Sequence, residues 1–337
     1  MNIPRLRAAQ PCPALKPIQP NVAMNLIRPL ITIGLLLANS VTAAPPRVAI
    51  LGDSITYGGT WCVRVESALR NTPEFADAEI VNFGLSSETV SGLSEEGHAG
   101  GKFPRPCLQE RQERVLNAFK PTLVLACYGM NDGIYLPPDP TRLKAYQDGI
   151  VRLKTAVEER GARLVLITPP LYNADKPSTD PLRYDAALDQ FAAWLIGQRA
   201  AGWQVVDIRA PLRAAIAKAK QEQPTFKYAG DGVHPGEKGH GFIADAVCAG
   251  LWQEWKLPGT PEIATEPALG ILAKRHHLLK HAWLSETKHT RPGVPAGLPM
   301  DQAREQAAKL LLEYRAALKS KVSVRQSHQR LNLIGFQ

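Results

Sequence analysis

Short apolar runs alternate with amphipathic stretches from Arg47 to about Trp255. The apolar runs predict five strands at Arg47–Gly52, Ala78–Phe83, Thr122–Tyr128, Arg163–Thr168 and Gln204–Ile208. The amphipathic stretches predict helices near Cys62–Asn71, Leu108–Phe119, Thr141–Arg160, Tyr184–Ala200, Pro211–Gln221 and Glu237–Glu254. This alternation is typical of a parallel sheet with helices on both faces.

Three long loops interrupt the alternation, and each follows a predicted strand. They are Leu85–Pro106, Ile134–Pro140 and Pro169–Pro181. Because open α/β sheets bind their ligands beyond the carboxyl ends of the strands, we expect these loops to border a site.

The pattern changes after Trp255. Pro258–Pro267 predicts a linker, and two helices are expected at Leu269–Ser285 and Asp301–Lys319. This part has no predicted strand and is small for a core of its own, so we expect it to pack on the α/β domain, beside the substrate cleft or at a subunit contact. The chain therefore divides into residues 1–43, 44–256 and 257–337.

The pattern of residues 1–43 is typical of an export signal region. Met24 offers a second start, Arg28 a positive residue, Leu30–Ala38 an apolar run and Val41–Ala43 a cleavage pattern. The apolar run is too short to span a bilayer, although an N-terminal anchor or an ordinary helix remains an alternative. We expect a signal peptide at 24–43 and a periplasmic or extracellular protein without stable membrane insertion.

Charge argues against nucleic acid as a partner. The 337 residues are 45% hydrophobic and carry a formal charge of +9. Residues 1–43 hold four of the bases and no acid, so the remaining chain has a surplus of +5. A small surplus without clustered Lys and Arg is a poor match to a phosphate backbone.

The cysteines indicate no metal site. Cys62, Cys107, Cys127 and Cys248 form no CxxC pair. A disulfide between Cys62 and Cys107 is one alternative, whereas Cys127 ends an apolar run and is expected to be buried.

A serine follows the first predicted strand directly, in the sequence Gly52-Asp53-Ser54-Ile55. A serine at a strand-to-helix turn exposes its hydroxyl near backbone N–H groups that favour an oxyanion. The alternative is that Ser54 is only a helix cap.

A second motif, Asp231-Gly232-Val233-His234, precedes the last helix of the α/β part. An Asp three residues before a His can hold Nδ1 of the imidazole and leave Nε2 free to deprotonate a serine. Two further strand ends offer oxyanion donors, namely Gly84 and Asn131. Taken singly, Gly84 is equally well a turn glycine and Asn131 a turn cap.

Together these residues resemble the four sequence blocks of the SGNH hydrolases, also called GDSL esterases/lipases. The blocks are Gly52-Asp53-Ser54-Ile55, Gly84, Gly129-Met130-Asn131-Asp132 and Asp231-Gly232-Val233-His234. Over residues 47–255 the resemblance implies an α/β fold: a three-layer, doubly wound sandwich with a five-stranded, parallel, flavodoxin-like sheet. The C-terminal helical extension follows it.

The resemblance also implies roles by position. Ser54 is the nucleophile, His234 the general base and Asp231 its orienting carboxylate. The Ser54 N–H, the Gly84 N–H and the Asn131 side chain form the oxyanion hole. This mechanism requires no metal and no organic cofactor.

The expected activity is that of a serine esterase acting through an acyl-enzyme. Export, a polar 85–106 loop and the lack of a long apolar lid favour short acyl groups on carbohydrate, acetyl esters first. The expected partner is therefore a small-molecule or polysaccharide acyl ester. Lysophospholipase, thioesterase and arylesterase activities remain alternatives, as does a non-catalytic carbohydrate-binding protein of the same fold.

Other residues carry weaker signals. His98, Lys102 and Arg105 could line the cleft, and the glycines around His98 do not have the spacing of a phosphate-binding loop. His277 and His281 have the spacing of a metal-binding pair, but without a third ligand a solvated helix face, shared with His276, is favoured.

Overall fold

The computed structural model describes residues 44–176 and 183–334, with side chains up to Ser320. Five parallel strands form one sheet in the order β2-β1-β3-β4-β5. They are β1 (Arg47–Gly52), β2 (Glu79–Asn82), β3 (Leu123–Cys127), β4 (Arg163–Ile167) and β5 (Gln204–Val206). The predicted flavodoxin-like sheet is confirmed, and each strand lies within its predicted range.

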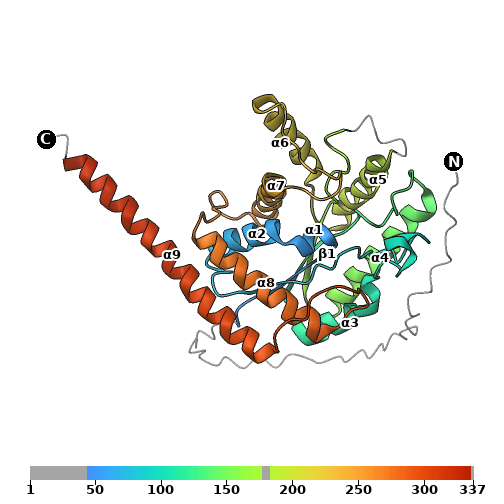
Figure 1. The fold of residues 1–337 in the computed structure, drawn as a ribbon, viewed down its shortest axis with the longest axis horizontal. Helices are drawn as coiled ribbons and strands as arrows, with labels where there is room; N and C mark the ends of the chain where they lie inside the picture. The colour runs from blue at the N-terminus through green and yellow to red at the C-terminus, as the bar shows by residue number, and fades with distance from the viewer. Residues whose placement is uncertain (1–43, 177–182, 335–337) are drawn as a thin grey trace, which may run out of the picture.

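Helices cover both faces of the sheet (Figure 1). The chain reverses its direction across the sheet after β2, so right-handed crossovers place α2 on one face and α3, α4 and α5 on the other. α7 packs beside α2, and α6 packs on α7. Their bounds are α2 (Thr60–Arg70), α3 (Leu108–Phe119), α4 (Pro140–Glu158), α5 (Tyr184–Gly197), α6 (Arg209–Glu222) and α7 (Glu237–Trp255).

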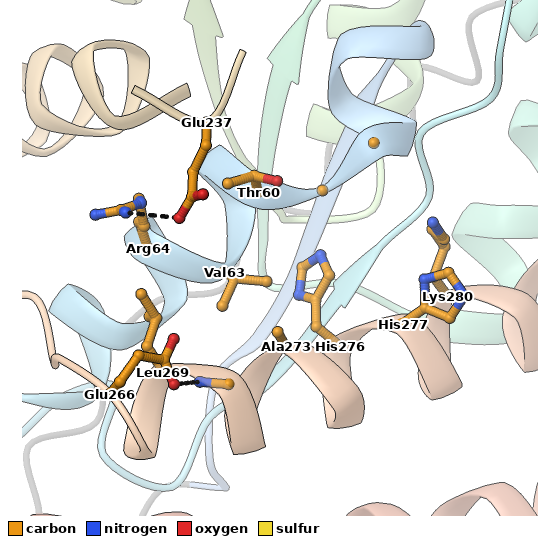
Figure 2. Close-up of a pocket in the computed structure, with 13 residues that line it drawn as sticks. Thr60, Val63, Arg64, Glu237, Glu266, Leu269, Ala273, His276, His277 and Lys280 are labelled. Carbon is orange, nitrogen blue, oxygen red and sulfur yellow. Dashed lines mark hydrogen bonds and ion pairs between the residues drawn. The ribbon is translucent and has the colours of Figure 1, made fainter. Parts of the chain in front are cut away.

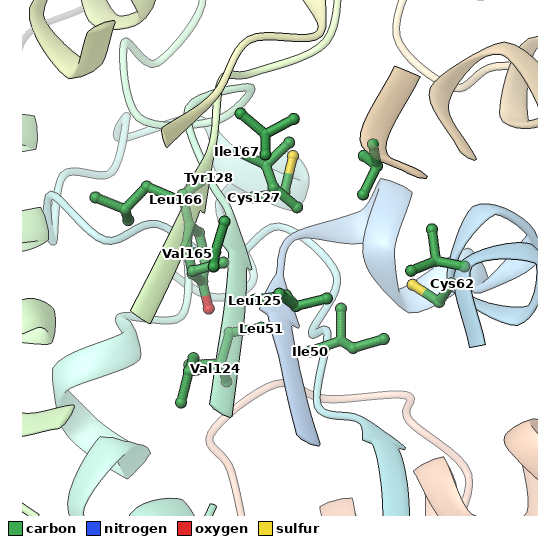
Figure 3. Close-up of a cluster of buried hydrophobic side chains, with 14 of the residues drawn as sticks. Ile50, Leu51, Cys62, Val124, Leu125, Cys127, Tyr128, Val165, Leu166 and Ile167 are labelled. Atoms are coloured by element: carbon green, nitrogen blue, oxygen red, sulfur yellow. The ribbon is translucent and has the colours of Figure 1, made fainter. Parts of the chain in front are cut away.

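The central strands supply the core. Ile50, Val124 and Leu125 are fully buried, because helices cover both faces of β1 and β3 and the central positions of these strands therefore face apolar layers (Figure 3). The register pairs Gly52 with Cys127 and Cys127 with Ile167. These three strands therefore end at one level, and the loops that follow them open on one edge.

A further helix, α8 (Ala268–Thr287), packs on this domain. It contacts α2, β2 and α3. Since α2 and α3 lie on opposite faces, α8 crosses the edge of the sheet at β2. Its Trp283 ring lies 5.2 Å from that of Phe119 and 5.8 Å from that of Phe83.

A buried carboxylate fixes α8 to α2. Glu66 accepts from Arg70 of its own helix (2.9 Å) and from Arg275 (2.7 Å), and its other oxygen lies 3.0 Å from Nδ1 of His276. Glu66 is fully buried, which alone would raise its pKa, but these three partners lower the pKa to about 2. The carboxylate is therefore ionised at all ordinary pH values.

The last helix, α9 (Met300–Ile334), lies against α8 and extends beyond the domain (Figure 1). Up to Ser320, its buried residues are Ala303, Ala307 and Tyr314, and the Tyr314 hydroxyl lies 3.2 Å from that of Ser67. The predicted end at Lys319 is wrong by fifteen residues. The apolar periodicity weakens there, but the helix contains no Gly or Pro that would end it.

The cysteine prediction needs one correction. Cys62 is a free, buried thiol whose Sγ lies 3.7 Å from the carbonyl oxygen of Thr56, so it does not pair with Cys107. Cys127 is buried and free, as the apolar run predicted.

The predicted signal region 1–43 lies outside the described residues, as does part of the predicted 169–181 loop. Within the described ranges, no helix combines the length and the apolar character that a membrane crossing needs.

Candidate active site

The end of β1 sets the position of Ser54. At Gly52 a Cβ would lie 2.1 Å from Thr56 Oγ1 and 2.7 Å from the Cys127 carbonyl oxygen, so only glycine fits. The next residue, Asp53, caps the short helix α1 (Ser54–Gly58) by accepting from the Ile55 N–H at 3.0 Å. Ser54 is thus the first helical residue, where a backbone N–H has no acceptor within the helix.

The loop before α7 holds the histidine. Oδ1 of Asp231 accepts from the N–H groups of Val233 (2.9 Å) and His234 (2.7 Å), which folds the four residues into a tight turn. Gly232 has a φ of +82°, a value that favours glycine. Its carbonyl accepts from the Asn173 N–H at 2.7 Å, so the loop after β4 braces this turn.

These two segments meet in a continuous hydrogen-bonded line. Nε2 of His234 lies 2.9 Å from Ser54 Oγ, and Nδ1 lies 2.7 Å from Asp231 Oδ2. Partial burial opposes ionisation of Asp231, but its bonds with His234 lower the carboxyl pKa to about 2. The side chains of His234 and Asp231 are 53% and 56% exposed. The geometry is that of a nucleophile, a base and an orienting carboxylate.

The three predicted oxyanion donors differ in their surroundings. The Ser54 N–H stands at the start of α1. Asn131 is 3% exposed and donates through Nδ2 to the Glu88 carbonyl oxygen at 3.3 Å, which leaves its second N–H for another acceptor. The Gly84 N–H, by contrast, already donates to Asn82 Oδ1 at 2.7 Å. An oxyanion there would share this donor with Asn82.

Gly84 also fits closely against α1. A Cβ on it would lie 2.5 Å from the Tyr57 nitrogen and 2.7 Å from the Thr56 carbonyl carbon. Asn82 donates to the Thr56 carbonyl oxygen at 2.7 Å. The end of β2 and the helix that carries Ser54 are therefore packed backbone to backbone.

Two buried carboxyl groups beneath the site were not predicted from the sequence. Burial raises the pKa of Asp53 to about 7 and that of Asp132 to about 6, although both accept backbone N–H bonds. Asp132 accepts from the N–H groups of Val90 (2.8 Å) and Ser91 (2.7 Å). It thereby attaches the 85–106 loop to the end of β3. Their only sequence signal was their place inside the motifs.

Of the three residues that the sequence predicted along the cleft, only Arg105 contacts a predicted site residue in the structure. Arg105 reaches the site, since its Nη1 donates to Asn131 Oδ1 at 2.9 Å. His98 has its Nδ1 3.5 Å from Glu95 and its ring edge-on to Phe103. Lys102 is exposed to solvent.

The three histidines of α8 differ in exposure: His277 is exposed, as predicted, His281 is half-buried and His276 is buried, so the predicted solvated face is confirmed only in part. His276 is 2% exposed and bound to Glu66. The His281 Nε2 lies 3.2 Å from the Tyr57 hydroxyl, and its ring packs against that of His277 at 4.3 Å. Nζ of Lys280 donates to the Tyr57 carbonyl oxygen at 2.7 Å. Helix α8 thus contacts the last turn of α1.

A separate hollow of about 210 Å³ lies between α2, the start of α7 and α8 (Figure 2). Arg64, Glu237, His276 and Lys280 are among the side chains around it. Ser54 and His234 do not line it. Within residues 44–176 and 183–334, no group of three or more His, Cys, Asp or Glu side chains has the arrangement of a metal site.

Comparison with known proteins gives the family. Residues 50–242 match the GDSL-like Lipase/Acylhydrolase family, which covers more than half of the chain. The chain therefore belongs to this family, as the sequence motifs predicted, and it is a hydrolase of ester bonds. A search of curated protein sequences found no match.

Several solved structures are similar to this chain. Axe2, an acetylxylan esterase from Geobacillus stearothermophilus, is 22% identical, with a TM-score of 0.45; the alignment covers 62% of this chain and 94% of Axe2. LAE5, an α/β hydrolase from the metagenome of Lake Arreo in Spain, is also 22% identical, with a TM-score of 0.46 and coverages of 62% and 95%. BT4096, a gut microbial diltiazem-metabolizing enzyme, is 19% identical, with a TM-score of 0.45 and coverages of 61% and 46%.

Proposed function

We propose that the chain is a serine esterase in which Ser54 attacks the ester, His234 is the general base and Asp231 orients it. The observation that carries this proposal is the line of two short hydrogen bonds from Asp231 through His234 to Ser54. An ionised Asp231 holds the proton on Nδ1, so that Nε2 faces the serine as an acceptor.

In the first half-reaction Ser54 Oγ bonds to the ester carbonyl carbon while His234 takes the hydroxyl proton. The oxyanion is stabilised by the Ser54 N–H and the Asn131 side chain, with Gly84 sharing its N–H. The C–O bond to the alcohol then breaks, and His234 donates the proton to the leaving oxygen. An acyl-serine remains.

In the second half-reaction water attacks the acyl-serine, and the same groups act again. His234 takes a proton from the water, and the same donors stabilise the second oxyanion. His234 then returns the proton to Ser54 Oγ as the carboxylic acid leaves. The cycle consumes one water per ester and restores the serine.

For the substrate we propose short acyl groups, acetyl first, on a bulky hydroxylated carrier such as a polysaccharide. The half-exposed imidazole of His234 leaves room for a large leaving group. The 85–106 loop carries polar side chains, among them the exposed Lys102 and Glu95, whose side chain is 24% exposed. In the described part of the chain the most exposed large hydrophobic side chains are Val151 of α4, Leu298 just before α9 and Leu312 of α9.

The test of catalysis is hydrolysis of p-nitrophenyl acetate by the wild type and by Ser54→Ala. We expect activity to fall by orders of magnitude in the variant. The matched control is Ser320→Ala, an exposed serine on α9, which should keep full activity. Equal rates for the wild type and Ser54→Ala would refute the serine mechanism and direct attention to carbohydrate binding without catalysis.

The substrate test compares acetyl, butyryl and octanoyl esters, followed by acetate release from an acetylated polysaccharide. We expect kcat/KM to decrease with chain length, because no exposed large hydrophobic side chain in the described part of the chain lies in the 85–106 loop, which would leave a long acyl chain in water. A preference for octanoyl esters would overturn the acetyl proposal and favour a lipid-type esterase.

We also propose that the protein is exported through a signal peptide at residues 24–43, on the sequence pattern alone. Mass spectrometry of the protein recovered from the periplasm or the medium should give a new N-terminus after Ala43 or Ala44. An intact N-terminus on a cytoplasmic protein would contradict this.

A further inference from the structure

We propose that Arg105 is a positioning residue that fixes the orientation of the Asn131 side-chain amide, with Nδ2 toward the oxyanion. This inference rests on the proposed function, in which Asn131 stabilises the tetrahedral intermediate. It adds a residue of the 85–106 loop, outside the four motifs, to the groups on which the reaction depends.

Asn131 has partners at both ends of its amide. Its Oδ1 accepts from Arg105 Nη1 at 2.9 Å and from the Tyr135 hydroxyl at 3.2 Å, which uses both lone pairs. Its Nδ2 donates one hydrogen to the Glu88 carbonyl oxygen at 3.3 Å. The second hydrogen of Nδ2 remains as the donor for the oxyanion.

Two of these partners, Arg105 and the Glu88 carbonyl, distinguish the two ends of the amide, and Arg105 makes the shorter bond. A tyrosine hydroxyl donates to an oxygen or accepts from an N–H, so Tyr135 tolerates either orientation. A guanidinium has donors and no acceptor, so a reversed amide would place Nδ2 against the N–H of Arg105. The Glu88 carbonyl only accepts, so it also opposes a reversed amide, but its contact of 3.3 Å is longer than the charge-assisted bond of 2.9 Å from Arg105.

Arg105 is itself held in place. Its Nε and Nη2 donate to the two oxygens of Glu95 at 2.7 and 2.6 Å, and its side chain is only 6% exposed. Its guanidinium carbon lies 5.3 Å from the centre of the Tyr135 ring, and its backbone N–H donates to Ser94 Oγ at 2.9 Å. Because the planar guanidinium is hydrogen-bonded to Glu95 on one side and to Asn131 on the other, it has little freedom to rotate.

Glu95 thus fixes the guanidinium of Arg105, and Arg105 in turn fixes the amide of Asn131. Although partial burial opposes ionisation of Glu95, its bonds with His98 and Arg105 lower the pKa of this carboxyl to about 2, so the pair remains ionic. The charged N–H on Oδ1 also polarises the amide and makes its N–H a better donor. The fixed orientation of the amide and its stronger N–H donor both stabilise the transition state more than the bound ester, because the negative charge on the substrate oxygen develops only there.

The test compares three substitutions at Arg105. Arg105→Lys keeps a donor-only group, Arg105→Gln offers a donor and an acceptor, and Arg105→Met offers neither. We expect kcat to fall about 10–100-fold in the Gln and Met variants, less than the loss of an oxyanion donor itself, with KM nearly unchanged and Lys closer to the wild type. If Arg105 only fills space, Met and Gln should be tolerated at least as well as Lys.

Arg160→Met is the matched control. Arg160 also binds one Glu and one Asn, namely Glu113 and Asn117, but it belongs to the turn after α4. We expect unchanged kcat for this variant, and thermal unfolding will show whether any Arg105 variant is simply unfolded.

A double-mutant cycle tests the route of the effect. In an Asn131→Ala background, Arg105→Met should cause little further loss of kcat, because the amide that it orients is gone. A full and additive loss, or wild-type kcat in Arg105→Met alone, would overturn the proposal.

A readout independent of turnover separates this proposal from the proposed function. The side-chain amide ¹H–¹⁵N signals of Asn131, assigned by their absence in Asn131→Ala, should shift or split in Arg105→Gln and not in Arg160→Met. Hydrolysis that does not depend on Ser54 would refute the proposed function, whereas unmoved amide signals would refute the positioning role.

Discussion

Asn131 illustrates how one side chain is prepared for its task at the residue scale. It is buried, its oxygen is saturated by two donors, and one of its N–H groups is left for a ligand. Such a donor needs no reorganisation when charge develops on the substrate.

The first prediction concerns Asn131→Ala. We expect kcat to fall by about 10²–10³ with a small change in KM, the usual loss for one oxyanion donor. Asn117→Ala, on the outer side of α3, is the control. Unchanged kcat in Asn131→Ala would leave the oxyanion to Ser54 and Gly84 alone.

The second prediction concerns the buried carboxyl of Asp53. Its pKa is raised to about 7 in the fold, so between about pH 4 and pH 7 the folded state holds a proton that the unfolded chain releases. This group therefore lowers stability as the pH rises through that range. In Asp53→Asn, which keeps the helix cap, the free energy of unfolding relative to the wild type should increase from pH 4 to pH 7.

Thermal or urea unfolding at several pH values measures this difference. Asp301→Asn, an exposed position at the start of α9, should show no such trend. A difference between Asp53→Asn and the wild type that is independent of pH would contradict the raised pKa of Asp53.

The meeting of Ser54 with His234 could be predicted from the sequence, because both lie in loops at the carboxyl edge of one sheet and their chemistry is complementary. The bond from the Gly84 N–H to Asn82 could not, since it depends on one side-chain rotamer. Likewise, the burial of Asp53 could not be predicted, because it depends on segments that are distant in the sequence and pack around the end of β1.

At the scale of elements, α8 is fixed by charge as well as by apolar contact. Glu66 lies between two arginines whose side chains are 2% and 7% exposed. Removing its charge would leave buried cations without their counter-ion.

The third prediction is that Glu66→Gln lowers the free energy of unfolding by about 3–5 kcal/mol, the usual cost of breaking a buried ion pair from one side. Glu305→Gln removes the acid of an exposed pair with Lys309 and should change little. Urea unfolding compares the two variants, and equal small effects would mean that the buried cluster contributes no stability.

The ends of an element could be predicted closely where polar or turn residues mark them in the sequence. β1 and α3 agree with the sequence at both ends, because apolar runs there are bounded by polar and turn residues. The short helix α1 was missed because five residues are too few for a helical period. The end of α9 was missed because its sequence lacks a stop signal.

At the scale of the whole molecule, the C-terminal extension is built into the hydrolase domain. Trp283 completes a cluster with Phe83 and Phe119, and Lys280 reaches the helix that carries Ser54. The sequence predicted that the helices would pack back, but the point of contact depends on long-range complementarity that it does not display.

We propose that the hydrolase domain ends at residue 256 and the C-terminal extension begins at residue 257. The fourth prediction compares two truncations of this extension. A chain ending at Pro258 should be insoluble or unfold at a much lower temperature, because it exposes Phe83 and Phe119 and leaves Glu66 with one fewer arginine. A chain ending at Ser320 keeps the Tyr314 contact and should retain activity. Equal melting temperatures for both would show that the extension is dispensable.

The path of α8 across β2 also bears on self-association. An edge strand presents unpaired N–H and C=O groups to which a second chain could add a strand. Here α8 lies at the β2 edge, so the chain shields one of the two edges of its sheet from strand addition. A proteolytic cut in the 258–266 segment that released α8 would therefore turn this protected sheet edge into a template for aggregation.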